Sequence, residues 1–385
     1  MVQSKSTNYS KKYESDFKLQ AIKLLEFTRD IKELADFLGV RNNFRFRKSK
    51  IYTLGQSGTK PKILVQGNGT DMSDIQALRG RAKRKLITNK VVLALIDLAN
   101  KKGDQIRLGS FWNTYHCQNK LISSEDRLYG VYCKNRFCTL CCSIRKAEII
   151  NTYLPILRKW EDPYFVTLTV KSPPLKHLTK MMAKVVEGFG QIIEKHKKRS
   201  QRNKGNKLVG IKSLECNFNP IKRTYNPHLH LIVQNEEMAK LIIEEWLIKW
   251  TPRFSNAKAQ HMRKVENKER DLIEIVKYGS KIFTDPDIKY KPKSIKDHKV
   301  YISALYNIYC AMENHRIFDR FGFNLPKTEK SIIENSITLD EYQEWVFDDK
   351  ATDWKNTDNE LSLTQYHMPP NLIELLNYNM DIVLE

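Results

Sequence analysis

Tyr225-Asn-Pro-His-Leu-His-Leu-Ile-Val233 is the stretch around which the rest of the chain can be interpreted. Its aliphatic residues alternate with His228 and His230, a pattern typical of a half-buried β-strand that carries both imidazoles on one face. Two imidazoles side by side can bind a metal ion, but a His-x-His pair is also common on ordinary surface strands. The stretch alone leaves both interpretations open.

Length and composition indicate a globular chain. Its 385 residues, 41% of them hydrophobic and 10% aromatic, are enough for one large domain with additions at either end. No apolar run reaches the roughly 18 residues that a membrane span needs, and the polar N-terminal region lacks the apolar core of a signal peptide. We therefore expect a cytoplasmic protein without a membrane partner.

The charge is distributed unevenly along the chain. The formal net charge is +22, yet residues 326–385 contain 4 Lys against 13 Asp and Glu, a net charge of −9, so that residues 1–325 carry +31. Such an excess favours a polyanionic partner, and nucleic acid is the first candidate. The acidic segment either competes with DNA or simply keeps the chain soluble.

Residues 1–100 are expected to form a helical, basic N-terminal region. Helical apolar spacing over 17–25 and 31–40, followed by the basic stretch 41–50, fits either a helix-turn-helix module or a plain helical hairpin. Residues 51–73, rich in Gly, Ser, Thr and Lys, are expected to be a linker.

A second basic cluster, residues 79–85, opens an apolar helix that is expected to run to about Asn100. Its cations would suit phosphate contacts that position DNA without reading its sequence.

Five of the seven cysteines fall between positions 117 and 142. Disulfides are disfavoured in the cytoplasm, so clustered thiols there more often bind metal, and Zn²⁺ takes four ligands in a tetrahedron. Cys142 and His116 are alternative ligands, and buried free thiols, as assumed for Cys216 and Cys310, are the alternative to a metal site. The four expected ligands of this structural zinc site are Cys117, Cys133, Cys138 and Cys141.

Two basic regions are candidates for DNA contacts. Arg145 and Lys146 follow the cysteines directly and could reach a phosphate from a zinc-stabilised platform. Residues 195–207 are expected to form a basic, hairpin-like loop that grips the DNA backbone. The cations of this loop that we select are Lys197, Lys198, Arg199 and Arg202.

The remaining pattern predicts a sheet flanked by helices. Residues 164–170 form the clearest strand, a helix with apolar residues from 178 to 192 could cover it, and 208–219 form a second strand. Glu215 in that strand is a candidate third metal ligand, with a salt bridge to a lysine as the equal alternative. Further elements are expected at 236–250 (helix), 260–265 (edge strand), 271–281 (helix) and 300–325 (closing helix).

In the helix expected over 271–281, Glu274, Tyr278 and Lys281 share one face at i, i+4 and i+7. On one face, a phenol could act as a nucleophile with a carboxylate and an ammonium beside it to assist the reaction. A tyrosine packed on the core between solvated neighbours is the alternative.

Taken together, these motifs resemble those of the His-hydrophobe-His (HUH) endonucleases: a Phe-Val-Thr-Leu-Thr strand, an Asn-Pro-His-Leu-His-Leu strand about 60 residues later and then a Tyr-x-x-Lys helix. The preceding Cys-Lys-Asn-Arg-Phe-Cys-x-x-Cys-x-x-x-Arg-Lys-Ala stretch is similar to the signature of the single-tyrosine rolling-circle replication initiators of bacterial plasmids. The resemblance covers roughly residues 110–325.

The resemblance implies an α+β fold whose central antiparallel sheet is flanked by helices, to which the cysteine pattern adds a zinc-knuckle-like cluster and the N-terminal spacing a helical extension. We therefore expect three domains: the helical, basic region 1–100, a nicking domain at 101–325 and, from its charge, an acidic appendage at 326–385. It implies that His228 and His230 bind a catalytic Mg²⁺ or Mn²⁺ and that Tyr278 is the nucleophile.

Within the same resemblance, Lys281 holds the phosphate or phenolate, and Glu274 activates the water that terminates replication. The products are a 5′-phosphotyrosine and a free 3′-hydroxyl primer. The implied partners are a replication origin, single-stranded or extruded as a hairpin, and the host helicase and polymerase.

Two alternatives remain at this level. Another HUH enzyme, a transposase or a relaxase, would share the same motifs, although relaxases usually carry the tyrosine before the histidines. A non-catalytic, zinc-containing DNA-binding regulator would use the histidines only for packing.

Overall fold

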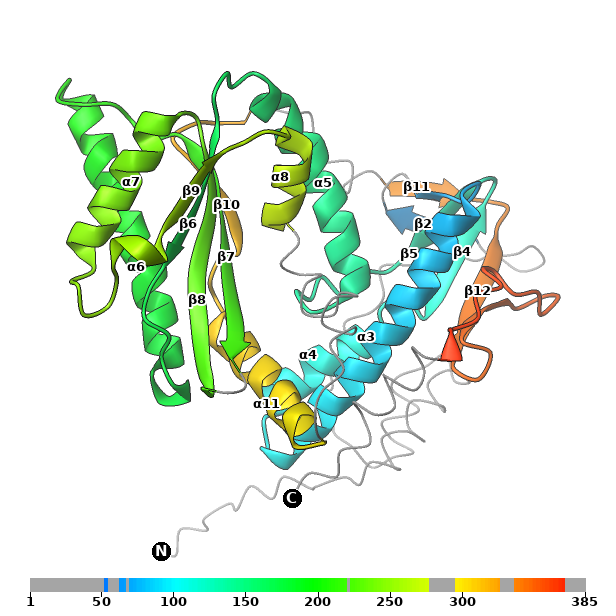
Figure 1. The fold of residues 1–385 in the computed structure, drawn as a ribbon. Helices are drawn as coiled ribbons and strands as arrows, with labels where there is room; N and C mark the ends of the chain where they lie inside the picture. The colour runs from blue at the N-terminus through cyan, green and yellow to red at the C-terminus, as the bar shows by residue number, and fades with distance from the viewer. Residues whose placement is uncertain are drawn as a thin grey trace, which may run out of the picture. The chain divides into compact units, whose positions relative to one another are not determined.

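The computed structural model describes residues 52–54, 62–66, 69–219, 222–276, 295–325 and 336–370. All of them belong to one compact unit that begins at Tyr52. The helices expected at 17–25 and 31–40 lie outside this part of the chain. Helices and antiparallel sheets are combined, so the α+β class is confirmed (Figure 1). Within the described ranges, no helix is long and apolar enough to cross a membrane.

The central sheet has five antiparallel strands in the order β10-β7-β8-β6-β9. The His-x-His stretch forms its middle strand, β8. The strand predicted at 164–170 lies inside the sheet, and the one predicted at 260–265 lies at its edge. The strands are β6 (Tyr164–Thr169), β7 (Gly210–Asn219), β8 (Thr224–Val233), β9 (His261–Lys264) and β10 (Phe318–Phe321).

One face of this sheet packs on α6 (Leu175–Gln201) and α7 (Glu236–Lys249) (Figure 1). Leu229, Leu231 and Val233 of β8 point to this side and are completely buried. Each such side chain contributes roughly 1.5–3 kcal/mol when it leaves water. The period-two alternation of β8 is therefore enforced by the core, and it turns both histidines to the opposite face.

The opposite face packs on α5 (Thr139–Arg158) and α8 (Lys268–Val276) (Figure 1). Apolar side chains of both helices meet those of the central strands in a second core. α5 and α8 cover only part of this face. The remainder of the face carries polar residues of β7 and β8. The members of this core include Tyr153, Leu157, Phe165, Ile211, Ile232, Leu272 and Ile275.

A second antiparallel sheet, β13-β12-β4-β5-β3, combines strands from distant parts of the sequence. Helices α3 (Ile75–Lys101) and α4 (Gln105–Tyr115) contact each other, and α3 packs on the second sheet. Its strands are β3 (Thr70–Asp71), β4 (Lys120–Ser124), β5 (Arg127–Gly130), β12 (Gln343–Asp348) and β13 (Asp353–Asn356). A third sheet consists of β1 (Tyr52–Leu54), β2 (Lys62–Gln66) and β11 (Ser336–Leu339).

These two sheets cross the boundaries expected from the sequence. α3 continues past residue 100, β12 pairs with β4, and β11 pairs with β2, so the segment expected as an acidic appendage supplies strands that pair with upstream ones. The division into three domains stays a prediction. The linker predicted at 51–73 is wrong, because this segment contains β1, β2 and β3; β1 pairs with β2, whereas β2 and β3 also pair with the distant strands β11 and β5.

Two further predictions need correction. The basic hairpin-like loop at 195–207 is helical up to Gln201, because the buried His196 contacts Glu245 of α7, 3.2 Å from ring nitrogen to carboxylate oxygen, and so keeps α6 intact. The closing helix expected over 300–325 is α11 (Ile295–Ala311), which ends before a turn with Asn314 at φ 64°. The chain then forms β10, the edge strand next to β7.

Two of the cations in the basic cluster at 79–85 point into the protein. Arg81 is buried and donates to the side chains of Gln118, at 2.8 Å, and Thr70, at 2.9 Å. Lys85 is completely buried, and its ammonium donates to the backbone carbonyls of Tyr115 and Cys117 and to a side chain of the same region. These two cations therefore stabilise the fold from within.

Candidate active site and thiol cluster

The register between β7 and β8 brings Glu215 opposite His228. Ser213, two residues before Glu215, is opposite His230 in the same way. Because side chains on neighbouring strands project to the same face at paired positions, the carboxylate and both imidazoles lie together. We call Glu215, His228 and His230 the His–Glu cluster.

Within the His–Glu cluster, one carboxylate oxygen of Glu215 is 3.6 Å from Nε2 of His228 and 3.5 Å from Nε2 of His230. The two imidazole rings are 4.8 Å apart, edge to face. All three potential ligand atoms lie within 4.8 Å of one another. A divalent cation could contact the three atoms at once, with its remaining coordination positions open to substrate or water.

Hydrogen bonds orient both imidazoles. Nδ1 of His228 is 2.8 Å from the carbonyl of Asn226, which can only accept, so Nδ1 carries the proton and Nε2 keeps its lone pair. Nδ1 of His230 is 3.0 Å from the hydroxyl of Thr167 on β6. A hydroxyl can accept from Nδ1, and His230 would then present Nε2 as the metal-binding nitrogen, as His228 does. This is the outer-shell arrangement that usually supports metal-binding histidines.

Burial makes the cluster asymmetric. Glu215 is completely buried and His228 nearly so, whereas the His230 side chain is 15% exposed. A buried carboxylate strengthens its interaction with a cation because little water screens it. Access to the cluster is therefore on the side of His230.

An arginine lies near the cluster on the edge strand. The guanidinium of Arg263 is 4.7 Å from the ring of Phe165, which in turn is 5.4 Å from the ring of His230. Arg263 also forms a two-pronged ion pair with the buried Asp271 of α8. This hydrogen-bonded pairing raises the pKa of Arg263 above its usual value. The pair ties α8 to the face of the sheet that carries the histidines.

Thr167, Arg263 and Asp271 are not among the site residues predicted from the sequence. Thr167 could have been found from the alternation of the strand at 164–170, since it shares a face with every second residue. The Arg263–Asp271 pair depends on how a helix and an edge strand meet, and the sequence carries no signal for that contact.

The residues of the expected helix at 271–281 are described only in part. Glu274 is half-buried on α8, and its charge helps to raise the pKa of Arg263. Tyr278 and Lys281 lie outside the described residues. α8 ends at Val276, and Leu272 and Ile275 hold it against the central sheet.

The four cysteines selected from the sequence also meet in space. The sulfur of Cys141 is 3.7 Å from that of Cys117 and 3.6 Å from that of Cys133, and all four sulfur atoms lie within 4.8 Å of one another. A tetrahedral zinc site with Zn–S bonds of about 2.3 Å has sulfur atoms about 3.8 Å apart, whereas a disulfide needs about 2 Å. We call Cys117, Cys133, Cys138 and Cys141 the thiol cluster.

Three elements supply the thiol cluster. Cys117 follows α4, Cys133 follows β5, and Cys138 lies at the N-terminus of α5, one turn before Cys141. Hydrogen bonds from neighbouring thiols lower the pKa of Cys133 below its usual value, so the group favours a thiolate there. The donor set fits Zn²⁺, which prefers sulfur ligands.

The alternative ligands have other contacts. Cys142 donates to the carbonyl of Arg136 at 3.0 Å, and burial raises its pKa to about 12. His116 stacks on Trp112 and contacts Asn119 at 3.2 Å. The buried ammonium of Lys85 lies behind the cluster, 2.9 Å from the carbonyl of Cys117. A thiolate cluster gains from a nearby positive charge of this kind.

Comparison with known proteins finds a similarity over part of the chain. It is 28% identical over 162 residues to Protein rep of Streptococcus pneumoniae serotype 2 (strain D39 / NCTC 7466). The match covers 39% of this chain and 47% of the relative, so the chain spans about half the length of the curated relative that it matches. The similarity is therefore to part of a Rep protein. No family model and no solved structure matches.

The cations expected to contact DNA are in two places. Arg145 and Lys146 lie on α5, where the Arg145 guanidinium donates to the carbonyl of Lys134 at 3.0 Å. The other four are at the C-terminal end of α6; two of them form loose, exposed ion pairs with Glu194. We call Lys197, Lys198, Arg199 and Arg202 the α6 basic end.

Proposed function

We propose that this chain is a plasmid replication initiator that nicks one strand of its origin through a tyrosine and starts rolling-circle replication. The convergence of Glu215, His228 and His230 on one accessible point carries the proposal. The similarity to a Rep protein supports the replication role. The excess positive charge of residues 1–325 suits a DNA partner.

The His–Glu cluster is proposed to hold Mg²⁺ or Mn²⁺. Two nitrogen ligands favour Mn²⁺ over Mg²⁺, which prefers oxygen, so Mn²⁺ should support the stronger activity in vitro. When bound, the ion would supply Lewis-acid polarisation of a phosphodiester oxygen. The protein contributes the orientation of the ligands through Asn226 and Thr167 and the buried charge of Glu215.

Tyr278 is proposed as the nucleophile. Its phenolate oxygen would attack the phosphorus of the scissile phosphodiester, and the bond from phosphorus to the 3′ oxygen would break. The 3′ oxygen leaves as a hydroxyl after taking up a proton, while the 5′ end stays bound to the tyrosine. An ammonium such as that of Lys281 would lower the cost of the phenolate, because a free tyrosine has a pKa of about 10.

The remaining roles concern the steps after the nick and the stability of the fold. The free 3′-hydroxyl would prime a host polymerase, with a host helicase to separate the strands. Glu274 is proposed to activate the water that ends replication. The thiol cluster is proposed to hold a structural Zn²⁺ that fixes the start of α5.

The test uses single-stranded DNA from the replicon that carries the gene, with and without Mn²⁺, and mass spectrometry of any peptide-linked nucleotide. Wild-type protein should give a metal-dependent adduct on Tyr278, and Tyr278→Phe should give none. Tyr164→Phe is the matched control, since Tyr164 is on β6 and its position in the strand turns it away from the histidine face. Glu274→Ala should nick normally but yield multimeric single strands.

Binding of DNA without any nicking would instead support a zinc-containing regulator. An adduct that persists in Tyr278→Phe would move the nucleophile to another residue. Normal monomeric products from Glu274→Ala would remove its role in termination.

A further inference from the structure

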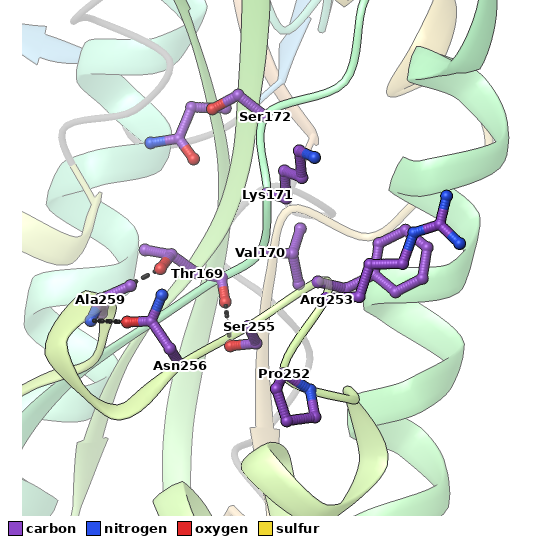
Figure 2. Close-up of a pocket in the computed structure, with 11 residues that line it drawn as sticks. Thr169, Val170, Lys171, Ser172, Pro252, Arg253, Ser255, Asn256 and Ala259 are labelled. Atoms are coloured by element: carbon purple, nitrogen blue, oxygen red, sulfur yellow. Dashed lines mark hydrogen bonds between the residues drawn. The ribbon is translucent and has the colours of Figure 1, made fainter.

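A pocket opens at the end of β6, next to the His–Glu cluster. It has a volume of about 500 Å³, within the range of roughly 300–1,000 Å³ that is usual for small-ligand sites. Two loops form it: the residues that follow β6 and the connection from α7 to β9 (Figure 2). We call it the strand-end pocket.

Two residues of the pocket lining are direct neighbours of His228. Asn226 lines it, is two residues before His228 on β8, and accepts the hydrogen bond that orients His228. Thr169 lines it as well and pairs directly with His228. Because residues i and i+2 of a strand share a face and lie about 7 Å apart, an occupant of the pocket would be a direct neighbour of the His–Glu cluster.

The lining favours an anionic ligand with a flat apolar part. Among the described residues that line it, Lys171 and Arg253 are cationic and none is acidic. The ring of Phe254 is partly exposed, and the guanidinium of Arg253 is 5.7 Å from its centre. Amide groups of Asn226 and Asn256 provide polar contacts. Cations with an exposed aromatic ring are the combination that holds single-stranded nucleic acid, by phosphate contact and base stacking.

The pocket is held in shape before any ligand binds. The carbonyl of Thr169 accepts from Trp246 at 3.0 Å. The same carbonyl accepts from Ser255 at 3.1 Å, and the hydroxyl of Thr169 donates to the carbonyl of Ala259 at 2.7 Å (Figure 2). The two loops are also joined through their backbones, with the Lys171 amide donating to the Phe254 carbonyl at 2.7 Å. A preformed site loses little conformational entropy on binding.

We propose that the strand-end pocket binds one nucleotide of the single-stranded substrate, next to the phosphodiester presented to the His–Glu cluster. Phe254 stacks on the base, and Lys171 and Arg253 contact the flanking phosphates. The inference rests on the proposed nicking function, because that function supplies the strand whose neighbouring nucleotide the pocket receives. It adds the residues that position this strand.

The test measures binding of a fluorescent single-stranded dT oligonucleotide to the full chain in EDTA, so that nicking plays no part. The double variant Lys171→Ala with Arg253→Ala should raise Kd by about 5- to 30-fold at 0.1 M salt and lower the log–log salt slope by about 1.4. Phe254→Ala should raise Kd by at least about five-fold and leave the salt slope unchanged. Lys258→Ala is the matched control, an exposed cation of the same connection that does not line the pocket.

The second arm places a photoreactive 5-iodouracil in the oligonucleotide and maps the crosslinked peptide. A crosslink at Phe254 supports the pocket, and crosslinks confined to the α6 basic end overturn it. Pocket variants that bind as the wild type does, in a protein that still nicks, remove the pocket and leave the proposed function standing. Weakened binding in a protein that never nicks keeps the pocket and removes the nicking function.

Discussion

Replacing Glu215 by Gln should abolish the stabilisation of the protein by Mn²⁺. Glu215 is completely buried, and one of its oxygens is about equally distant from both imidazoles, at 3.6 and 3.5 Å. The substitution keeps the size of the side chain and removes the negative charge of the cluster. Because loss of an outer-shell partner already weakens metal sites by about 10- to 100-fold, loss of this ligand should cost at least about 100-fold in affinity.

The size of the effect follows from linkage. At a free Mn²⁺ concentration about 100 times Kd, binding stabilises the wild-type protein by about 2.7 kcal/mol. For a chain of this length, that energy corresponds to an increase in Tm of about 3 °C. If Kd rises about 100-fold in Glu215→Gln, the stabilisation falls to about 0.4 kcal/mol, and the shift in Tm to less than about 1 °C.

Differential scanning fluorimetry with and without Mn²⁺ measures both shifts, and two controls separate metal binding from folding. Ser213→Ala changes the same face of β7 and should keep the full shift. Asp353→Asn disturbs a buried carboxylate of the second sheet that accepts from the backbone amides of Thr364 and Gln365. It should lower Tm in both conditions and keep the Mn²⁺ shift. A full shift in Glu215→Gln, or an equal loss in Ser213→Ala, would refute the assignment of Glu215 as a ligand.

Three further predictions concern other parts of the molecule. Serine substitution at any member of the thiol cluster should lower the zinc content from one ion per chain, measured by mass spectrometry of the metal, whereas Cys142→Ser and Cys216→Ser should retain it. Lys85→Met should destabilise the protein by about 2–4 kcal/mol in urea unfolding, since three buried or partly buried acceptors lose their ammonium donor. Gln at all four positions of the α6 basic end should lower the salt slope of DNA binding by up to about 3, with Lys240→Gln, which removes an exposed cation of α7 paired with Glu236, as an unaffected control.

The inner strands of the central sheet could be predicted from the sequence because β6 and β8 each have one apolar face. In β8 the core-facing residues leave no freedom of register, so the face of His228 and His230 followed directly. Glu215 could be proposed as a third ligand because β7 precedes β8 by a short connection, and antiparallel neighbours bring such residues together.

The second sheet could not be predicted, for a physical reason. Its strands are short, and β12 finds its partner β4 more than 200 residues earlier. The segment around Trp345 and Phe347 is also acidic overall, so its net charge concealed the alternation that buries these two rings. The strand-end pocket escaped prediction as well, because loops from separate parts of the chain create it.

α5 connects the thiol cluster to α8. Cys138 lies at the N-terminus of this helix, and Tyr153 and Leu157 near its other end pack with Leu272 and Ile275 of α8. α8 ends at Val276, two residues before the proposed nucleophile Tyr278, so the contacts that run from the thiol cluster through α5 to α8 fix the point from which the chain continues to that tyrosine.

Removing zinc should therefore reduce nicking even when Mn²⁺ saturates the His–Glu cluster. The expected signature is a lower kcat at saturating oligonucleotide, with the Mn²⁺-induced change in Tm still present, because the ligands on β7 and β8 form their cluster through strand pairing alone. If kcat is unchanged after complete loss of zinc, the apolar contacts of α5 are sufficient to hold the helix in place. The thiol cluster then stabilises only the N-terminal end of α5. If the Mn²⁺ shift disappears together with zinc, the two clusters depend on one another for folding, and the independence argued from the β7–β8 register does not hold.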